Sequence, residues 1–462
     1  MIKKIDFEKL PVVEVVNDIL VDAAKRGASD IHFDPLEDHM KVRIRIDGDL
    51  IDYAEVPNDI KKNLVTRIKI ISGMNITESR LPQDGAIKTT LSNMMLDLRV
   101  SALPTNNGEK IVIRILDYSM SQAGLESLGF SKSNYEKVLK MIGSPNGIIL
   151  VTGATGSGKS TTVYSVLQRL NKEETNIITV EDPIEMNIEG INQVQTNSEI
   201  GLTFATALRS ILRQDPNIIM IGEIRDSETA QIAVRASITG HLVLSTIHTN
   251  SSLNTIERLL DMDVERYLLA SALTGVISQK LARRLCPKCR KLRPTNDYEK
   301  HLLREITGQT INEVYVNVGC EECNNGYKGR IAIHEVLLVN QKIKDAISNN
   351  MRKEDFRELV YTSDVTTLLQ DGINKVLAGE TTIEEILKLI VLDNDDIKKD
   401  EKTDIDQAIH YSNMTSEKVE TKPQVKEEVK PVETKVEIEP KEEVVTDKSQ
   451  NDLDDFDINL DI

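Results

Sequence analysis

The stretch Gly153-Ala-Thr-Gly-Ser-Gly-Lys-Ser160 decides the fold of this chain. It follows an apolar run at residues 148–151 and precedes a helical pattern at residues 161–170, which is the context that a phosphate-binding loop requires. Its glycines let the backbone wrap closely round a polyphosphate, so that successive N–H groups and the positive end of the helix point at it. The stretch therefore predicts a P-loop that binds a nucleotide, rather than a glycine-rich turn that binds nothing.

The side chains of this loop have separate expected roles. Lys159 reaches the β- and γ-phosphates of ATP as a point charge, and the hydroxyl of Ser160 is a ligand for Mg²⁺. The residues that we expect to bind the nucleotide are Gly153, Thr155, Gly156, Ser157, Gly158, Lys159, Ser160 and Thr161. A P-loop between a buried strand and a helix predicts an α/β fold for this part of the chain.

Length, hydropathy and charge exclude several classes of protein. A chain of 462 residues allows two or three domains. It contains no run of about 18 apolar residues and no secretory signal, so we expect a cytoplasmic protein that is at most peripheral to a membrane. Residues 393–462 hold 22 acidic and 10 basic residues, so they carry −12 of the net charge of −17. The remaining −5 leaves no global basic field, and we expect no nucleic-acid partner.

The apolar pattern divides the chain into four parts. These are a mixed α/β domain at residues 1–117, a linker at 118–125, a second α/β domain with the P-loop at 126–392, and a tail at 393–462. The last part of the second domain, at about residues 340–392, is predicted to be helical. The tail has few aromatic anchors and cannot bury enough apolar surface to offset the entropy of ordering it, so we predict disorder there. In the first domain we predict helices at 12–25 and 58–72, strands at 40–46, 94–101 and 110–116, and a hairpin turn at Asp47-Gly48.

Acidic residues follow two apolar strands of the P-loop domain. Residues 176–180 lead into Glu181-Asp182-Pro183-Ile184-Glu185, and residues 217–221 lead into Gly222-Glu223. Because the carboxyl ends of parallel strands bind ligands, we expect these acids to face the nucleotide rather than to be solvated loop residues. A carboxylate there can orient the attacking water and accept its proton, and Glu223, in the Walker B place, can hold Mg²⁺.

Four basic residues allow two interpretations each. His241 and His248 bracket the strand at 242–246, so either one can hydrogen-bond a terminal phosphate or serve only as a structural histidine. Arg99 and Arg114 alternate with apolar residues in two predicted strands, so both should emerge on the face opposite the buried side chains. The pattern alone favours ordinary solvated arginines over phosphate ligands for this pair.

The four cysteines form two C-x-x-C pairs with 30 residues between them: Cys286, Cys289, Cys320 and Cys323. Two such pairs satisfy a tetrahedral site, normally zinc, and leave no open position for catalysis, so we predict a structural zinc module at about residues 283–330. Four reduced cysteines without a metal are one alternative. A zinc module that reads nucleic acid is another, and it is weakened by Glu321 and Glu322 between two of the ligands.

Taken together, these motifs resemble those of the type II secretion and type IV pilus assembly ATPases over about residues 10–392. Residues 153–162 resemble the Walker A box of that family, 178–185 its Asp box, 221–226 its Walker B box and 240–248 its His box. The resemblance implies a homohexamer whose subunits pair an N-terminal PAS-like domain with a RecA-like ATPase domain and bind ATP between the two. It also implies a location at the inner membrane, with a membrane platform protein and pilin or pseudopilin machinery as partners.

The resemblance also implies roles for single residues. Glu185 is expected to be the catalytic carboxylate, and Glu223 is expected to organise Mg²⁺ and water. His241 and His248 are expected to sense the terminal phosphate. Arg99 and Arg114 look like the family's phosphate-contacting arginines, which reverses the interpretation from pattern alone. The cysteine module is similar to that of the assembly and secretion members and unlike the pilus retraction ATPases.

The leading hypothesis is therefore an ATP-hydrolysing hexameric motor, with ATP, Mg²⁺ and Zn²⁺ as cofactors, that powers pilus assembly or extrusion of a secretion pseudopilus. One alternative is a nucleic-acid-associated RecA-like NTPase, whose turnover would be stimulated by DNA or RNA. Another is a nucleotide-gated scaffold that binds ATP and releases no phosphate.

Overall fold

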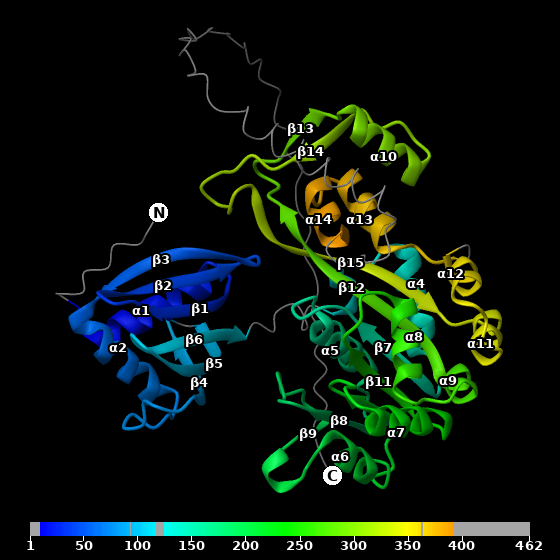
Figure 1. Ribbon diagram of the computed structural model, residues 1–462, viewed down its shortest axis with the longest axis horizontal. Helices are drawn as coiled ribbons and strands as arrows, with labels where there is room; N and C mark the ends of the chain where they lie inside the picture. The colour runs from blue at the N-terminus through cyan, green and yellow to red at the C-terminus, as the bar shows by residue number, and fades with distance from the viewer. Residues whose placement is uncertain (1–9, 93, 117–123, 362–363, 392–462) are drawn as a thin grey trace, which may run out of the picture. The chain divides into compact units, whose positions relative to one another are not determined.

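The computed structural model describes residues 10–92, 94–116, 124–361 and 364–391 (Figure 1). Within these ranges the chain forms a six-stranded sheet, a seven-stranded sheet and a two-stranded sheet. Most of the predicted linker and the whole of the predicted disordered tail lie outside the described residues. Among the described helices, none is long and apolar enough to span a membrane.

The six-stranded sheet is antiparallel, and its strand order is β3-β2-β1-β6-β5-β4. The helices packed with it have one apolar face each, and both contribute to the same buried core. Asp47 and Gly48 both have positive φ in the turn from β2 to β3, which agrees with the predicted hairpin. The elements are α1 (Val12–Lys25), β1 (Ala28–Pro35), β2 (His39–Ile46), β3 (Asp49–Pro57), α2 (Asn58–Ile71), β4 (Gln83–Leu91), β5 (Met94–Thr105) and β6 (Gly108–Leu116).

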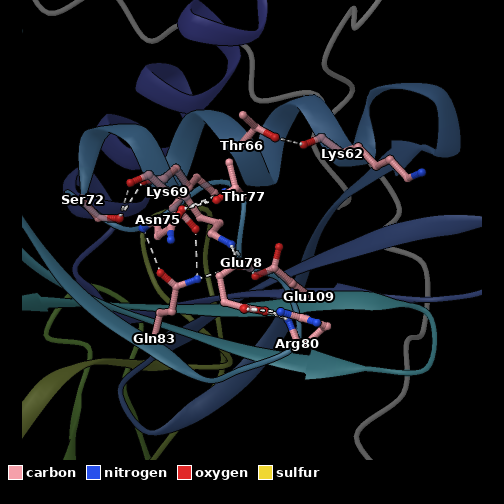
Figure 2. A network of polar contacts seen from close by, with 11 residues as sticks. Lys62, Thr66, Lys69, Ser72, Asn75, Thr77, Glu78, Arg80, Gln83 and Glu109 are labelled. Atoms are coloured by element: carbon pink, nitrogen blue, oxygen red, sulfur yellow. Dashed lines mark hydrogen bonds and ion pairs between the residues drawn. The ribbon is translucent and has the colours of Figure 1, made fainter.

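A buried lysine organises the loop between α2 and β4 (Figure 2). Lys69 Nζ donates to the carbonyl oxygen of Glu78 at 2.6 Å and to Glu109 Oε1 on β6 at 2.7 Å. Gln83 Nε2 donates to the same carbonyl at 2.7 Å, and the Glu78 carboxylate accepts from the Arg80 guanidinium. A buried ammonium needs such partners to offset its desolvation. These contacts give the loop one defined shape and join it to the sheet.

The seven-stranded sheet has the order β15-β12-β7-β11-β10-β8-β9, in which only β15 pairs in antiparallel fashion. Alternate residues of β7 belong to two separate cores: Ile148 and Leu150 to one, and Ile149 and Val151 to the other. Such double burial is typical of parallel sheets with helices on both faces. The elements from the start of this part to β12 are η1 (Leu125–Leu128), α4 (Lys132–Ile142), β7 (Gly147–Thr152), α5 (Lys159–Leu170), β8 (Ile177–Glu181), β9 (Asn192–Gln195), η2 (Ser198–Ile200), α6 (Phe204–Ile211), β10 (Ile218–Ile221), α7 (Ser227–Ile238), β11 (Leu242–Ile247), α8 (Ser252–Asp261), α9 (Arg266–Ala272) and β12 (Leu273–Leu285).

The last part of the described chain adds a small subdomain and a group of helices. The strands β13 and β14 form the two-stranded sheet, and Leu303, Ile373 and Ile386 belong to a core of their own. The elements are β13 (Lys291–Pro294), α10 (Asp297–Thr307), β14 (Glu313–Val316), β15 (Tyr327–Leu338), α11 (Gln341–Ser348), α12 (Lys353–Tyr361), α13 (Leu368–Leu377) and α14 (Ile383–Val391). The helices α11 to α14 lie in the segment, at about residues 340–392, for which the sequence predicts a helical C-terminal part.

Candidate nucleotide site and cysteine cluster

The P-loop connects the end of β7 to the start of α5, as the sequence predicted. Gly153 and Gly158 have φ of 150° and 89°, in the region that side chains other than glycine rarely adopt. A Cβ at Gly153 would lie 2.4 Å from the carbonyl oxygen of Gln279, and a Cβ at Gly158 would lie 2.7 Å from Gln279 Nε2. Both conformation and space therefore require glycine at these two positions.

Two polar side chains of the loop fit a phosphate group. Lys159 Nζ donates to the carbonyl oxygens of Gly153 at 2.8 Å and Ala154 at 3.0 Å, and burial lowers the pKa of this lysine. Ser157 Oγ is buried and has no hydrogen-bond partner in the part of the chain that the structure describes. An unpaired buried polar group costs about 1–3 kcal/mol, and a phosphate oxygen would supply its partner. Ser160 lies in the first turn of α5 and is exposed, as a ligand for Mg²⁺ must be.

Gln279, on β12, joins this loop to the helix that follows it through one amide group. Its Nε2 donates to the carbonyl oxygen of Ser157 at 2.7 Å, and its Oε1 accepts from Thr162 Oγ1 at 2.7 Å. Gln279 and Thr162 are both buried. The amide therefore connects the loop to the first turns of α5 without itself belonging to the P-loop motif.

Replacing Gln279 by leucine is expected to weaken ATP binding. The carbonyl oxygen of Ser157 and the hydroxyl of Thr162 lose their partners, and each such loss costs about 1–3 kcal/mol unless the loop opens to water. An opened loop must be ordered again when ATP binds, so we expect the Kd for ATP to rise roughly 5- to 100-fold. Titration with a fluorescent ATP analogue measures this change, with the exposed Gln341→Leu as the control. Equal affinity in Gln279→Leu and wild type would contradict the role of Gln279.

The three carboxylates after β8 do not share one environment. Glu181 is the last residue of β8 and only 3% exposed, and it accepts hydrogen bonds from Thr179 Oγ1 at 2.5 Å and from Tyr164. The expectation that all three acids face the nucleotide is therefore wrong for Glu181, because the alternation of β8 turns this side chain into the interior. Asp182 is exposed, and Glu185 is partly buried in the loop that follows.

Residues of three sequence motifs meet at the carboxyl edge of the sheet. Glu223 follows β10 and is largely buried, Arg225 Nη2 donates to its Oε1 at 2.5 Å, and His248 Nε2 lies 3.5 Å from its Oε2. Burial lowers the pKa of His248, and the positive charge of Lys159 lowers it further, while Glu223 opposes the shift. The structure therefore brings Glu223 and His248 together, with Lys159 near enough for its charge to lower the pKa of His248.

His241 lies apart from this group. β11 begins one residue after His241 and ends one residue before His248, so the two histidines lie at opposite ends of a six-residue strand, about 20 Å apart. His241 Nδ1 is 2.9 Å from the carbonyl oxygen of Ala236, at the amino edge of the sheet. The structure thus gives His241 a structural contact and does not bring it to the phosphate-binding residues of this chain.

The two candidate arginines face each other across the pair of strands β5 and β6. Arg99 and Arg114 are directly opposite in the register, and their neighbours Leu98, Val100 and Ile113 are buried on the other face, as the alternation predicted. Like charges directly opposite each other are unfavourable in a sheet. An anion such as a phosphate would offset this repulsion.

Each arginine also has an acidic partner. Arg114 Nε donates to Asp30 Oδ1 at 3.1 Å, and its side chain is 65% exposed. Arg99 Nη2 donates to the carbonyl oxygen of Ile184 at 2.7 Å and lies 3.2 Å from Glu185 Oε2. The structure therefore brings Arg99 to the predicted catalytic carboxylate, and it places Arg114 beside Asp30.

The cysteine sulfur atoms form one cluster, in which all four Sγ atoms lie within 4.8 Å of one another. The Sγ–Sγ distances are 3.9 Å for Cys286 and Cys320, 3.7 Å for Cys289 and Cys323, and 3.5 Å for Cys320 and Cys323. A tetrahedron of thiolates at the usual zinc–sulfur distance has edges of about 3.8 Å. The geometry therefore fits a closed tetrahedral zinc site, with one C-x-x-C pair after β12 and the other before β15.

Two residues of the site have no counterpart among those predicted from the sequence. Gln279 lies 117 residues after its partner Thr162, and Tyr164, which contacts Glu181, lies in the middle of α5. The sequence around them carries no clear signal: Gln279 lies between Ser278 and Lys280 in β12, and Tyr164 lies between Val163 and Ser165 in α5. Even a residue known to be a buried polar group would not identify its partner on another element.

Comparison with known proteins agrees with the motifs. A family model described as "Type II/IV secretion system protein" matches residues 6–388. The chain is 46% identical over 380 residues to "Type II secretion system protein E" of Dickeya dadantii, which covers 82% of this chain and 76% of that protein. It is 45% identical over 381 residues to "Type IV pilus assembly ATPase PilB" of Myxococcus xanthus, which covers 82% of this chain and 67% of that protein.

A solved structure has the same fold. The crystal structure of the pilus retraction motor PilT with bound ADP aligns with a TM-score of 0.55 and 26% identity, and the alignment covers 81% of this chain and 96% of that chain. These matches confirm the predicted α/β fold class. Since the family model and the relatives above 40% identity both span most of the sequence, the chain belongs to the family of type II/IV secretion system proteins.

Proposed function

We propose that this chain is an ATP-hydrolysing motor of a type IV pilus assembly or type II secretion system. The observation that carries the proposal is the meeting of Lys159, Glu223 and His248, from three separate motifs, at the carboxyl edge of the seven-stranded sheet. Ligands bind at this edge in parallel α/β sheets. Two relatives that are named ATPases, at 42% and 45% identity, support hydrolysis rather than binding alone.

The proposed chemistry is phosphoryl transfer from ATP to water. Lys159 and the backbone N–H groups of the loop hold the β- and γ-phosphates, and Ser157 gains the partner that it lacks. Ser160 and Glu223 would hold Mg²⁺, which neutralises charge on the phosphates when bound. Glu185 orients the attacking water and accepts its proton.

The two arginines are proposed to stabilise negative charge on the γ-phosphate. Arg99 and Arg114 face each other on one sheet surface, so both guanidinium groups can approach one anion. An arginine in this role contributes about 10³ to 10⁵ in rate in related phosphoryl transfers. For Arg99, reaching the phosphate means exchanging its present contacts with Ile184 and Glu185.

The assembly that we propose is a homohexamer on the cytoplasmic face of the inner membrane. Each subunit has a PAS-like domain (1–117), a linker (118–125), a RecA-like ATPase domain (126–392) that ends in a helical part (about 340–392), and a tail (393–462). The two large sheets support this division, because the core of the six-stranded sheet is separate from the two cores that flank the seven-stranded sheet. Closure of the two domains over ATP would then drive a membrane platform protein that moves pilin or pseudopilin subunits.

Phosphate release by the full chain tests this proposal. We expect turnover to rise with protein concentration as the ring assembles, and to be unchanged by single-stranded DNA or RNA at fixed salt. A nucleic-acid-associated NTPase would instead be stimulated by nucleic acid, with a steep loss of binding as salt rises. ATP binding without phosphate release at any concentration would indicate a nucleotide-gated scaffold and contradict the motor.

A further inference from the structure

A buried tyrosine connects the helix of the P-loop to the loop that carries Glu185. Tyr164, on α5, is 4% exposed. Its hydroxyl donates to Glu181 Oε2 and accepts the backbone N–H of Glu185 at 3.1 Å. The hydroxyl oxygen of Tyr164 therefore holds the main chain at Glu185, the candidate catalytic residue.

Glu181 is itself fixed on its other side. Its Oε1 accepts from Thr179 Oγ1 at 2.5 Å and from Gln193 Nε2 at 3.0 Å. The same Gln193 amide donates to the carbonyl oxygen of Met186 at 2.9 Å and accepts the N–H of Ile188 at 2.8 Å. The backbone on both sides of Glu185 is thus tied to one buried polar network centred on Glu181.

We propose that Tyr164, through its bonds to Glu181 and to the Glu185 backbone, is a positioning residue that sets Glu185 relative to the phosphate-binding lysine. This inference rests on the proposed function, in which Glu185 is the general base. Lys159 and Tyr164 are five residues apart on one rigid helix, so the element that holds the phosphates also holds the base. Such geometry matters because a displacement of about 1 Å can cost about 10² in rate.

The surroundings of Tyr164 keep its hydroxyl protonated. Burial raises the pKa of Tyr164, and the hydrogen bond to the negatively charged Glu181 raises it further. The phenol therefore stays protonated near neutral pH and remains a hydrogen-bond donor. A buried hydroxyl needs an acceptor in any case, so the bond that points to positioning is the second one, from the backbone N–H of Glu185.

Replacing Tyr164 by phenylalanine tests the inference by removing one oxygen atom. We expect kcat for ATP hydrolysis to fall roughly 10- to 100-fold while KM for ATP changes less than about threefold, because the phosphate-binding residues are untouched. The control is Tyr135→Phe, which removes an exposed hydroxyl that donates to Glu126 Oε1 at 2.6 Å. The control should keep the wild-type kcat.

A second variant separates positioning from stability. Glu181→Gln keeps the shape of the side chain but leaves one oxygen for the three donors Tyr164, Thr179 and Gln193. We therefore expect kcat to fall, but by less than in Tyr164→Phe. The double variant with Tyr164→Phe should be no slower than Tyr164→Phe alone, since both changes break the same connection. If Tyr164→Phe does not fold, the kcat of Glu181→Gln decides, and a wild-type value there rejects the inference.

The rate of ATP hydrolysis by Glu185→Gln, measured alongside, distinguishes a failure of the proposed function from a failure of the inference about Tyr164. If Glu185→Gln hydrolyses ATP at the wild-type rate, the assignment of the base is wrong, and the inference about Tyr164 falls with it. If Glu185→Gln is slow but Tyr164→Phe has the wild-type kcat and a lower melting temperature, Tyr164 is only a structural residue. The proposed function then survives without the inference.

Discussion

Replacing Glu185 by glutamine is expected to leave ATP binding intact and to slow hydrolysis by about 10²- to 10⁴-fold, the usual contribution of a general base. The amide has nearly the shape of the carboxylate, but it cannot accept the proton of the attacking water. The substitution leaves Lys159 and the loop proposed to hold the phosphates unchanged, so the Kd for ATP should stay within about threefold. Single-turnover phosphate release and titration with a fluorescent analogue measure the two quantities separately.

The chain offers a matched control for this change. Glu189 is exposed and lies four residues further along the same loop, so Glu189→Gln makes the same change in charge without approaching the phosphates. It should hydrolyse ATP at the wild-type rate. Turnover by Glu185→Gln within about twofold of wild type would overturn the assignment of the base, and Asp182, which is exposed in the same loop, would become the candidate.

The elements that the sequence predicted well are those whose pattern is local. The first predicted helix, residues 12–25, coincides with α1, and the P-loop follows a strand whose residues are all buried. The strand β4 escaped prediction because it lies at the edge of its sheet and has only Ile87 buried, so its sequence shows no apolar alternation. The strands predicted at 94–101 and 110–116 correspond to β5 and β6. Both observed strands are longer than predicted, because the pairing in their hairpin continues to Thr105 and Gly108.

Within the candidate site, the sequence predicted which residues carry chemistry better than which way they point. Glu181 and Glu185 both follow an apolar strand, yet only Glu185 lies outside the interior, because Glu181 is still part of the strand alternation. His241 and His248 belong to one motif but lie at opposite ends of β11. Gln279 and Tyr164 act through partners on other elements, and such contacts follow from the packing of the whole sheet.

The cysteine cluster leads to the second large expected effect. Replacing Cys286 by serine removes one of four ligands, and we expect the zinc content of the purified chain to fall from one per subunit to near zero. Structural zinc sites contribute about 10–16 kcal/mol of apparent binding free energy near pH 7, all of which stabilises the folded form. Between the two C-x-x-C pairs, the described residues that are buried and apolar are only Leu303 and Val314, so little else can hold this segment.

Hydrogen exchange locates the consequence. In Cys286→Ser, or after treatment with a strong zinc chelator, we expect the amides of β13, α10 and β14 to lose protection, while those of β7 and α5 keep it because their core is separate. Glu322→Gln is the matched control, since it breaks the 2.5 Å ion pair with Lys288 beside the cluster and leaves every thiolate in place. A metal-free wild type with four titratable thiols and the same protection would contradict the zinc site. Unchanged ATP affinity in Cys286→Ser, together with the lost protection, would show that the cluster stabilises its own segment and takes no part in holding the nucleotide.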